Sequence, residues 1–205
     1  MHTKFNAIIF DLGNVIVDIN AEHTRQQLHA LGIANPQDIF TVQDQNALCD
    51  EFECGRLTSQ QFLHALRDYS TQENVSLDAI QQAWDAMILD VSLQRLDILR
   101  ALSKEYRLFL LSNTNQIHYN YLNNKLREQF DIPCIDLFFE KAYFSFKIGL
   151  RKPMREIFDH ILIDSDLKTD NTLFIDDLGQ NITTANQLGI TTWHVTNTAD
   201  LWEKL

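Results

Sequence analysis

Two apolar runs, one near each end of the chain, both stop at acidic residues. Residues 8–10 precede Asp11, and residues 173–175 precede Asp176 and Asp177. Continuous apolar runs of this length are typical of buried strands in a parallel sheet. In an open parallel sheet, reactive groups gather in the crevice at the carboxyl ends of the strands. If both runs belong to one sheet, Asp11 and Asp177 meet in that crevice although they lie at opposite ends of the sequence.

A single acid after a strand most often caps the helix that follows it. Here three acids stand at two strand ends. Gly13 and Gly179 follow Asp11 and Asp177 at a distance of two residues and allow the backbone to turn closely there. Capping alone does not readily explain this arrangement, so we interpret the two strand ends as parts of one site.

The pattern of apolar residues divides the chain into two parts. From about residue 21 to 89 the spacing is helical, without strand-like alternation. After residue 92, strands and helices alternate, which is typical of an α/β sheet. The predicted strands after this point are 107–111, 142–144, 172–175 and 191–195. The predicted helices are 93–102, 116–126, 153–162 and 178–188.

These segments predict the fold class and its division into domains. We expect an α/β protein with a Rossmann-like, doubly wound parallel sheet as its core. Residues 1–15 and 92–205 would form this core, and residues 16–91 would form an inserted helical cap. Within the cap, Thr58 and Gln61 predict a capping box. Ser76 predicts the start of a helix with an apolar face formed by Leu77, Ile80, Trp84, Met87 and Ile88.

Composition narrows the classes of partner and the compartment. The 205 residues carry a formal net charge of −11, which disfavours nucleic acid and anionic membrane surfaces as partners. Cys49, Cys54 and Cys134 form no C-x-x-C pair and are odd in number, so reduced thiols are expected. The apolar run after the first residues is too short for a signal-peptide core or a membrane span. We expect a cytoplasmic protein of undetermined oligomeric state.

Two further segments carry groups that suit an anion. Ser112, Asn113 and Thr114 follow a predicted strand and place a hydroxyl and backbone N–H groups where a helix begins. Arg151 and Lys152 stand directly before another helix. A cation at the same sheet edge as Asp11 and Asp177 would keep those carboxylates ionised and close together.

Taken in order, these segments resemble the four signature motifs of the haloacid dehalogenase-like (HAD) hydrolase superfamily. The motifs are Asp11-Leu12-Gly13-Asn14, Ser112-Asn113-Thr114, Lys152-Pro153 and Asp176-Asp177. The sequence around them is most similar to the branch that holds the glucose-1-phosphate phosphatases and the N-terminal phosphatase domain of soluble epoxide hydrolases. The resemblance implies a Rossmann-like core, a helical cap and Mg²⁺-dependent phosphoryl transfer through an aspartyl-phosphate.

The resemblance also implies a role for each motif residue. Asp11 would be the nucleophile, and Asp11, Asp177 and the Gly13 carbonyl would ligate Mg²⁺. Ser112, the backbone N–H of Asn113 and Lys152 would bind the phosphoryl oxygens of a small phosphorylated substrate. Asp176 would lie behind the metal ligands or cap the following helix, with Asn181 one turn further on.

One position departs from the pattern of most phosphatases in the superfamily. The residue two past the nucleophile is usually a second Asp, which protonates the leaving group, and here it is Gly13. We therefore predict a preference for good leaving groups, such as those of sugar 1-phosphates. Alternatively, a cap residue such as Glu53 or His23 supplies the proton. Glu53 belongs to a Glu-x-Gly-Arg turn, which either faces the active site or is a simple turn.

Two other functions remain open at this point. A 2-haloacid dehalogenase on the same fold would use the nucleophilic Asp without acid or metal. The adjacent Asp176 and Asp177 weigh against it, because clustered carboxylates are costly without a cation. A phospho-accepting or catalytically silent binding module is the second alternative. Steady Mg²⁺-dependent turnover of an aryl phosphate would exclude both.

Overall fold

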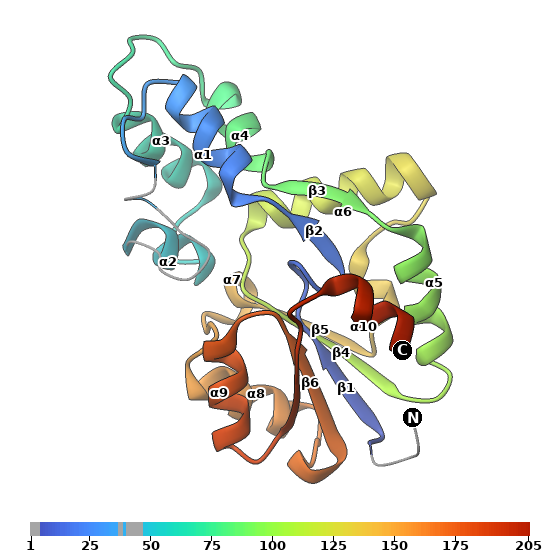
Figure 1. The fold of residues 1–205 in the computed structure, drawn as a ribbon. Helices are drawn as coiled ribbons and strands as arrows, with labels where there is room; N and C mark the ends of the chain where they lie inside the picture. Colours follow the sequence, from blue (N-terminus) through green and yellow to red (C-terminus); the bar gives the residue numbers. More distant parts are fainter. Residues whose placement is uncertain (1–4, 37–38, 40–46) are drawn as a thin grey trace.

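The computed structural model describes residues 5–36, 39 and 47–205 and shows an α/β core that carries a smaller group of helices (Figure 1). The strands are β1 (Ala7–Phe10), β2 (Val17–Ile19), β3 (Ile88–Val91), β4 (Arg107–Ser112), β5 (Lys141–Phe144), β6 (Thr172–Asp176) and β7 (Thr191–His194). The helices are α1 (Ala21–Ala30), α2 (Ala47–Glu53), α3 (Ser59–Asp68), α4 (Leu77–Asp85), α5 (Leu93–Leu102), α6 (Gln116–Phe130), α7 (Ser145–Ile148), α8 (Arg155–Asp164), α9 (Gly179–Gln187) and α10 (Thr198–Lys204).

The core is a five-stranded parallel sheet in the order β5-β4-β1-β6-β7. The chain starts in the middle at β1, builds outward through β4 and β5, and then crosses to the other side of β1 for β6 and β7. The carboxyl end of β1 is therefore the switch point, where an open α/β sheet binds ligands. This topology confirms the predicted parallel core and places Asp11 between the ends of β4 and β6.

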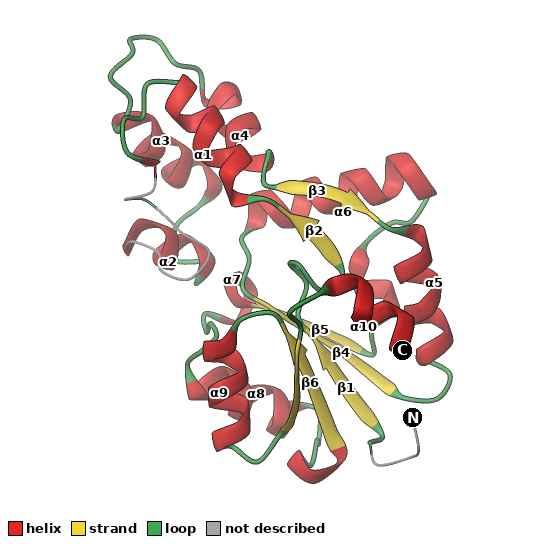
Figure 2. Cartoon of the chain, in the orientation of Figure 1, coloured by secondary structure: helices red, strands yellow, loops and turns green. Residues whose placement is uncertain are grey.

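Alternation along the strands explains why helices cover both faces of the sheet. Ile8 and Phe10 of β1 pack with α5, α6 and α10, whereas Ala7 and Ile9 pack with α8 and α9. Successive strand residues point to opposite faces, so a strand that is apolar throughout requires cover on both sides. Figure 2 shows this arrangement, with α8 and α9 on one side of the sheet and α5 and α10 on the other.

The cap consists of helices α1 to α4 around their own apolar cluster. Thr58 and Gln61 form the predicted capping box at the start of α3, and Ser76 accepts a hydrogen bond from the Ala79 N–H at the start of α4. Three buried aromatic rings form a row in this cluster: Phe62 contacts Phe52 on one side and Trp84 on the other. This separate cluster supports the proposed division into core and cap, which stays a prediction at its boundaries. Residues 1–4 of the predicted core and residues 37–38 and 40–46 of the predicted cap lie outside the described residues.

The prediction of helix throughout residues 21–89 is wrong at its end. Helix α4 stops at Asp85, and Ile88 belongs to β3, which pairs antiparallel with β2. The apolar residues Met87 and Ile88 continue the helical period of α4, so the pattern alone could not reveal the strand. Pairing with Val17 and Ile19, far away in the sequence, decides the conformation. The cap is therefore joined to the core by a two-stranded ribbon (Figure 1).

The remaining elements agree closely with the sequence pattern. The four predicted strands after residue 92 occur within one residue of their expected bounds, and helix 93–102 matches α5 at both ends. Helix α6 runs four residues beyond the expected end, to Phe130, and closes with Asp131 in the left-handed conformation. Among the described residues, no helix has the length and apolar character that a membrane span requires.

Candidate functional site

A pocket of about 130 Å³ lies at the carboxyl end of the sheet, between the core and the cap. Its lining includes all six predicted site residues, which are Asp11, Gly13, Ser112, Asn113, Lys152 and Asp177. We call the part lined by Asp11, Lys152 and Asp177, together with Asp176, which is buried against Lys152, the acidic end of the pocket. Cap residues such as Glu53 and Trp84 line the opposite part, which we call the cap end.

Lys152 binds two of the three acids at the acidic end. Its ammonium Nζ donates to Asp11 Oδ1 and to Asp176 Oδ2, each at 2.6 Å. The Lys152 side chain is 1% exposed, and that of Asp176 is 0% exposed. A buried charge of this kind is stable only with partners at hydrogen-bonding distance. The sequence predicted that this cation would hold Asp11 and Asp177 together, and the structure places it against Asp11 and Asp176 instead.

The charges of this cluster are only partly balanced. Burial raises the pKa of Asp11 to about 7, against the opposing effect of Lys152. Burial also raises the pKa of Asp177. Although burial by itself disfavours the charged ammonium, the neighbouring Asp11 and Asp176 raise the pKa of Lys152. Three carboxylates around one ammonium leave excess negative charge, which a further cation would neutralise.

Asp176 and Asp177 differ in their hydrogen bonds. Asp176 Oδ1 accepts from the Leu178 N–H at 2.8 Å, and both of its oxygens accept from Asn181 at 3.0 Å. Together with Lys152 these donors surround Asp176, which lies just before the start of α9. Asp177 is only half-buried, and its Oδ2 accepts a hydrogen bond from Asn14 Nδ2 at 3.1 Å. Asp177 therefore has more capacity left for a ligand.

Oxygen atoms of Asp11, Asp176 and Asp177 lie within 4.8 Å of one another. Carboxylate oxygens are hard ligands of the kind that Mg²⁺ prefers, and Mg²⁺ needs few protein ligands because it keeps several waters. Since the oxygens of Asp176 are already used, Asp11 and Asp177 are the two acids with capacity to hold a metal. The residues present therefore fit a divalent cation.

Asn14 is a site residue whose role the motif alone did not reveal. Its backbone has φ 54°, in the left-handed region that Asn tolerates better than most residues. Its side chain reaches across to Asp177, and its carbonyl accepts a hydrogen bond from Thr198 at 2.7 Å. The turn after β1 is thus fastened to both β6 and the C-terminal helix. An Asn at a tight turn directly after a strand was the available sequence signal.

The loop after β4 is tied to the segment that carries Lys152. Asn113 Nδ2 donates to the Lys152 carbonyl, and the Lys152 N–H donates to Asn113 Oδ1, both at 2.8 Å. Ser112 is 2% exposed and lines the pocket beside Asn113. This reciprocal pair fixes Lys152 relative to the end of β4. The side chain of Asn113 is therefore occupied by positioning Lys152.

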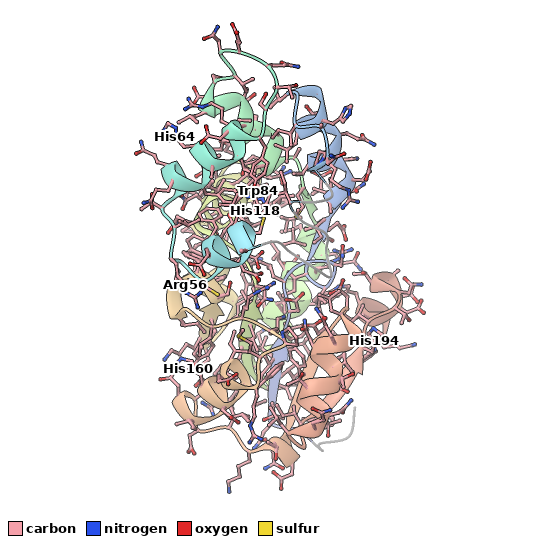
Figure 3. All side chains as sticks on the ribbon, turned by 90° about the vertical axis from the view of Figure 1, so that its left-hand side faces the viewer. Arg56, His64, Trp84, His118, His160 and His194 are labelled. Atoms are coloured by element: carbon pink, nitrogen blue, oxygen red, sulfur yellow. The ribbon has the colours of Figure 1, made fainter. Side chains whose placement is uncertain are left out.

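At the cap end, Trp84 and His118 join the cap to the core (Figure 3). Their rings stack with centroids 5.2 Å apart, and His118 Nε2 lies 3.0 Å from the Trp84 carbonyl. Burial lowers the pKa of His118 to about 4, so the ring is neutral at pH 7. Its Nδ1 lies 3.2 Å from Asn115 Nδ2. Both ring nitrogens are thus engaged, and His118 has a structural role.

The two cap residues considered as proton donors differ in position. Glu53 is 9% exposed and lines the pocket. His23 is exposed on α1 and does not belong to the pocket lining. Figure 3 shows that His160 and His194 also lie apart from the junction of cap and core. Of these alternatives, only Glu53 is in a position to contact a ligand in the pocket.

Comparison with known proteins agrees with this geometry. D-ribitol-5-phosphate phosphatase of Bacteroides thetaiotaomicron is 33% identical over 198 residues, which cover 97% of this chain and 95% of the relative. The HAD family enzyme bt-2542 of the same organism was solved in complex with magnesium and inorganic phosphate. It superimposes with a TM-score of 0.84 at 28% identity, covering 96% of this chain and 98% of that chain.

A dehalogenase shares the fold at lower similarity. The L-2-haloacid dehalogenase RSc1362 superimposes with a TM-score of 0.63 at 14% identity, covering 98% of this chain and 99% of that chain, and this likeness concerns the fold alone. The family model of haloacid dehalogenase-like hydrolases matches residues 5–189. The chain therefore belongs to the haloacid dehalogenase-like hydrolases and is a phosphatase of that family.

Proposed function

We propose that this protein is a Mg²⁺-dependent phosphatase that hydrolyses the phosphate monoester of a small sugar or polyol through an aspartyl-phosphate on Asp11. The observation that carries the proposal is the buried contact of Lys152 with Asp11 and Asp176 at the floor of the pocket. A carboxylate held in this way has a fixed direction of attack, which is what covalent catalysis requires.

Each site residue has a defined task in this reaction. A carboxylate oxygen of Asp11 attacks phosphorus, the bond to the leaving oxygen breaks, and water then cleaves the acyl-phosphate and regenerates Asp11. Lys152 and Ser112, together with the backbone at Asn113, bind phosphoryl oxygens, whose charge dominates the transition state. Asp11, Asp177 and the Gly13 carbonyl would hold Mg²⁺. The bound metal supplies positive charge that allows the substrate phosphate to approach these carboxylates.

The substrate class rests on two supports. A relative at 33% identity over nearly the whole chain is named for a polyol phosphate, and similar structures hold magnesium and inorganic phosphate. A dehalogenase is less well supported, because Asp176 and Asp177 add charge that halide displacement does not need. A silent phospho-accepting module is also less well supported, since the relative is named as an enzyme.

The basic test is turnover of p-nitrophenyl phosphate by the purified protein. We expect steady release of p-nitrophenol that stops after EDTA treatment and dialysis and returns with Mg²⁺. Release of halide from 2-chloropropionate, with no phosphatase activity, would favour the dehalogenase. Release of a single equivalent of p-nitrophenol, with the phosphoryl group retained on the protein and no further turnover, would favour the phospho-accepting module.

For the preferred substrate, we propose sugar 1-phosphates. A positioned general acid contributes about 10² to 10⁴ in rate, and Gly13 offers no side chain to supply it. The anomeric hydroxyl is a better leaving group than a primary alcohol, so its phosphate depends less on such an acid. The resemblance of the motifs to glucose-1-phosphate phosphatases supports the same preference.

This preference is tested by comparing kcat/KM for glucose 1-phosphate, glucose 6-phosphate and ribitol 5-phosphate. The 1-phosphate should be hydrolysed fastest. The variant Gly13→Asp should raise the rate on the other two substrates. A Cβ at this position would lie 3.0 Å from Ile19 Cδ1, so Ile19→Val is included to make room. If the wild type hydrolyses either other substrate as fast as the 1-phosphate, the leaving-group argument fails.

A further inference from the structure

Glu53 and Arg151 place two opposite charges on the wall of the pocket. Glu53 ends α2 of the cap, and Arg151 directly precedes Lys152 in the core. Arg151 Nη2 lies 3.3 Å from Glu53 Oε2, and their side chains are 18% and 11% exposed. Both residues line the same pocket as Asp11 and Lys152. This pair therefore stands where the part of a substrate beyond the phosphate would extend.

The position of Glu53 relative to the core is fixed by two neighbouring contacts. Asp50, one turn earlier on α2, forms a second ion pair with Arg151. Gly55 lies so close to the core that a Cβ there would be 2.1 Å from the carbonyl oxygen of Phe146. Only glycine fits at this approach. Glu53 is thus held over the pocket between an ion pair and a backbone contact.

Much of the remaining wall at the cap end is apolar. Its lining includes Val17, Ile19, Trp84, Met87, Ile88 and Leu122. An apolar leaving group would suit these residues, but it would strip water from Glu53 and Arg151 without replacing the lost hydrogen bonds. A leaving group that carries hydroxyls replaces them, because a hydroxyl donates to a carboxylate and accepts from a guanidinium.

Arg151 has a donor left for such a hydroxyl. Its Nε atom is buried and makes no hydrogen bond to any of the described residues. Buried N–H groups are normally satisfied by protein, water or ligand. Asp50 and Glu53 contact the two terminal nitrogens of the guanidinium. The fork of Arg151 is therefore oriented by the cap, while its Nε donor has no hydrogen-bond partner among the described residues.

We propose that Glu53 and Arg151 together bind the hydroxyl groups of the leaving group, and so select sugar or polyol phosphates over phosphates without hydroxyls. The inference rests on the proposed phosphatase function and assigns the substrate selectivity of that same site. Glu53 accepts hydrogen bonds from the substrate, and Arg151 donates to it. Because one residue comes from the cap and the other from the core, selectivity requires the cap in its observed position.

The test measures selectivity as a ratio of two kcat/KM values. The numerator is that of glucose 1-phosphate or ribitol 5-phosphate, whichever the wild type hydrolyses faster. The denominator is that of phenyl phosphate, which has no hydroxyl. Glu53→Gln keeps the size of the side chain but removes its charge, and Arg151→Lys keeps the charge but removes the Nε donor and the fork. Each should lower the ratio by at least about 10-fold, as expected for a hydrogen bond to a charged group.

Asp50→Asn is the matched control, because it removes the other ion pair of Arg151 at a residue outside the pocket lining. Thermal melting of all three variants separates loss of folding from loss of selectivity. An unchanged ratio in either pocket variant overturns the proposal. A fall of the same size in Asp50→Asn also overturns it, since the pair would then act only as a latch between cap and core. Absence of Mg²⁺-dependent phosphatase activity in the wild type would instead contradict the proposed function.

Discussion

At the acidic end of the pocket, Asp11 and Asp176 stand at the ends of neighbouring strands of one sheet, whereas at the cap end Trp84 and Glu53 come from helices of an inserted segment. The first pair shares one ammonium, Lys152, at 2.6 Å. The second pair reaches the core through His118 and Arg151. The chemistry is thus carried by the sheet, and the choice of substrate by contacts between two parts of the chain. Changes at the two ends should have different consequences.

The largest effect is expected from Asp11→Asn. The substitution removes the proposed nucleophile without changing the volume of the side chain, so turnover should fall below about a hundredth of the wild-type rate. The melting temperature should remain close to that of the wild type, because one acid remains beside Lys152. Initial rates on p-nitrophenyl phosphate and a thermal melt measure both quantities. Residual activity above that level would contradict covalent catalysis by Asp11.

An intermediate effect is expected from Asp177→Asn at the same end. The amide that replaces the carboxylate keeps one oxygen for a metal but carries no charge. The Mg²⁺ concentration for half-maximal rate should therefore rise by about 10- to 100-fold. The rate at saturating Mg²⁺ should change less. Titration of the rate with MgCl₂ measures the shift. A wild-type protein that stays fully active after EDTA and dialysis would show that the metal assignment is wrong.

The smallest effect on activity is expected from His118→Phe at the cap end, where the expected change is in stability. Burial depresses the pKa of His118 from 6.5 to about 4, so the fold favours the neutral ring. The corresponding stability is complete above pH 6.5 and is lost as the pH falls toward 4. The difference in unfolding free energy between wild type and variant should therefore shrink by roughly 3 kcal/mol over this range.

Urea unfolding at several pH values between 4 and 7.5 measures this difference, and the variant supplies the background titration of all other groups. A difference that does not change with pH would mean that His118 is protonated equally in the folded and unfolded states. The activity of His118→Phe near pH 7 should stay close to that of the wild type, in contrast to the variants at the acidic end. The reason is that the ring nitrogens of His118 are engaged by Trp84 and Asn115.

The acidic end was largely predictable from sequence. Asp11, Ser112 and Asp177 stand directly at or after apolar runs, and topology brings the ends of such runs together whatever lies between them. Their positions in the pocket agree with the prediction, while their catalytic roles remain proposals. The sequence indicated that Lys152 is a cation at the same edge of the sheet. Its simultaneous contact with Asp11 and Asp176 could be seen only in the three-dimensional structure.

The cap end and the ribbon were less predictable, because their contacts join residues that are distant in sequence. The stacking of Trp84 on His118 and the ion pair of Glu53 with Arg151 leave no periodic signal in either segment. The strand at Ile88 was hidden by the helical period that precedes it. These features are determined by packing and strand pairing between distant segments, and not by the intrinsic secondary-structure propensity of each segment.

The antiparallel ribbon of β2 and β3 has a mechanical consequence. Both crossings between core and cap run through it, side by side and hydrogen-bonded to each other. Near its core end it is anchored by Arg95, which donates to the Ile16 carbonyl at 3.2 Å and to Asp18 at 2.8 Å. Because the two connecting strands are hydrogen-bonded to each other, they should move together, which restricts how the cap can move relative to the core. Ile19 belongs to β2 and lies next to Gly13, so a ligand that displaces the ribbon would also shift Ile19 relative to Gly13.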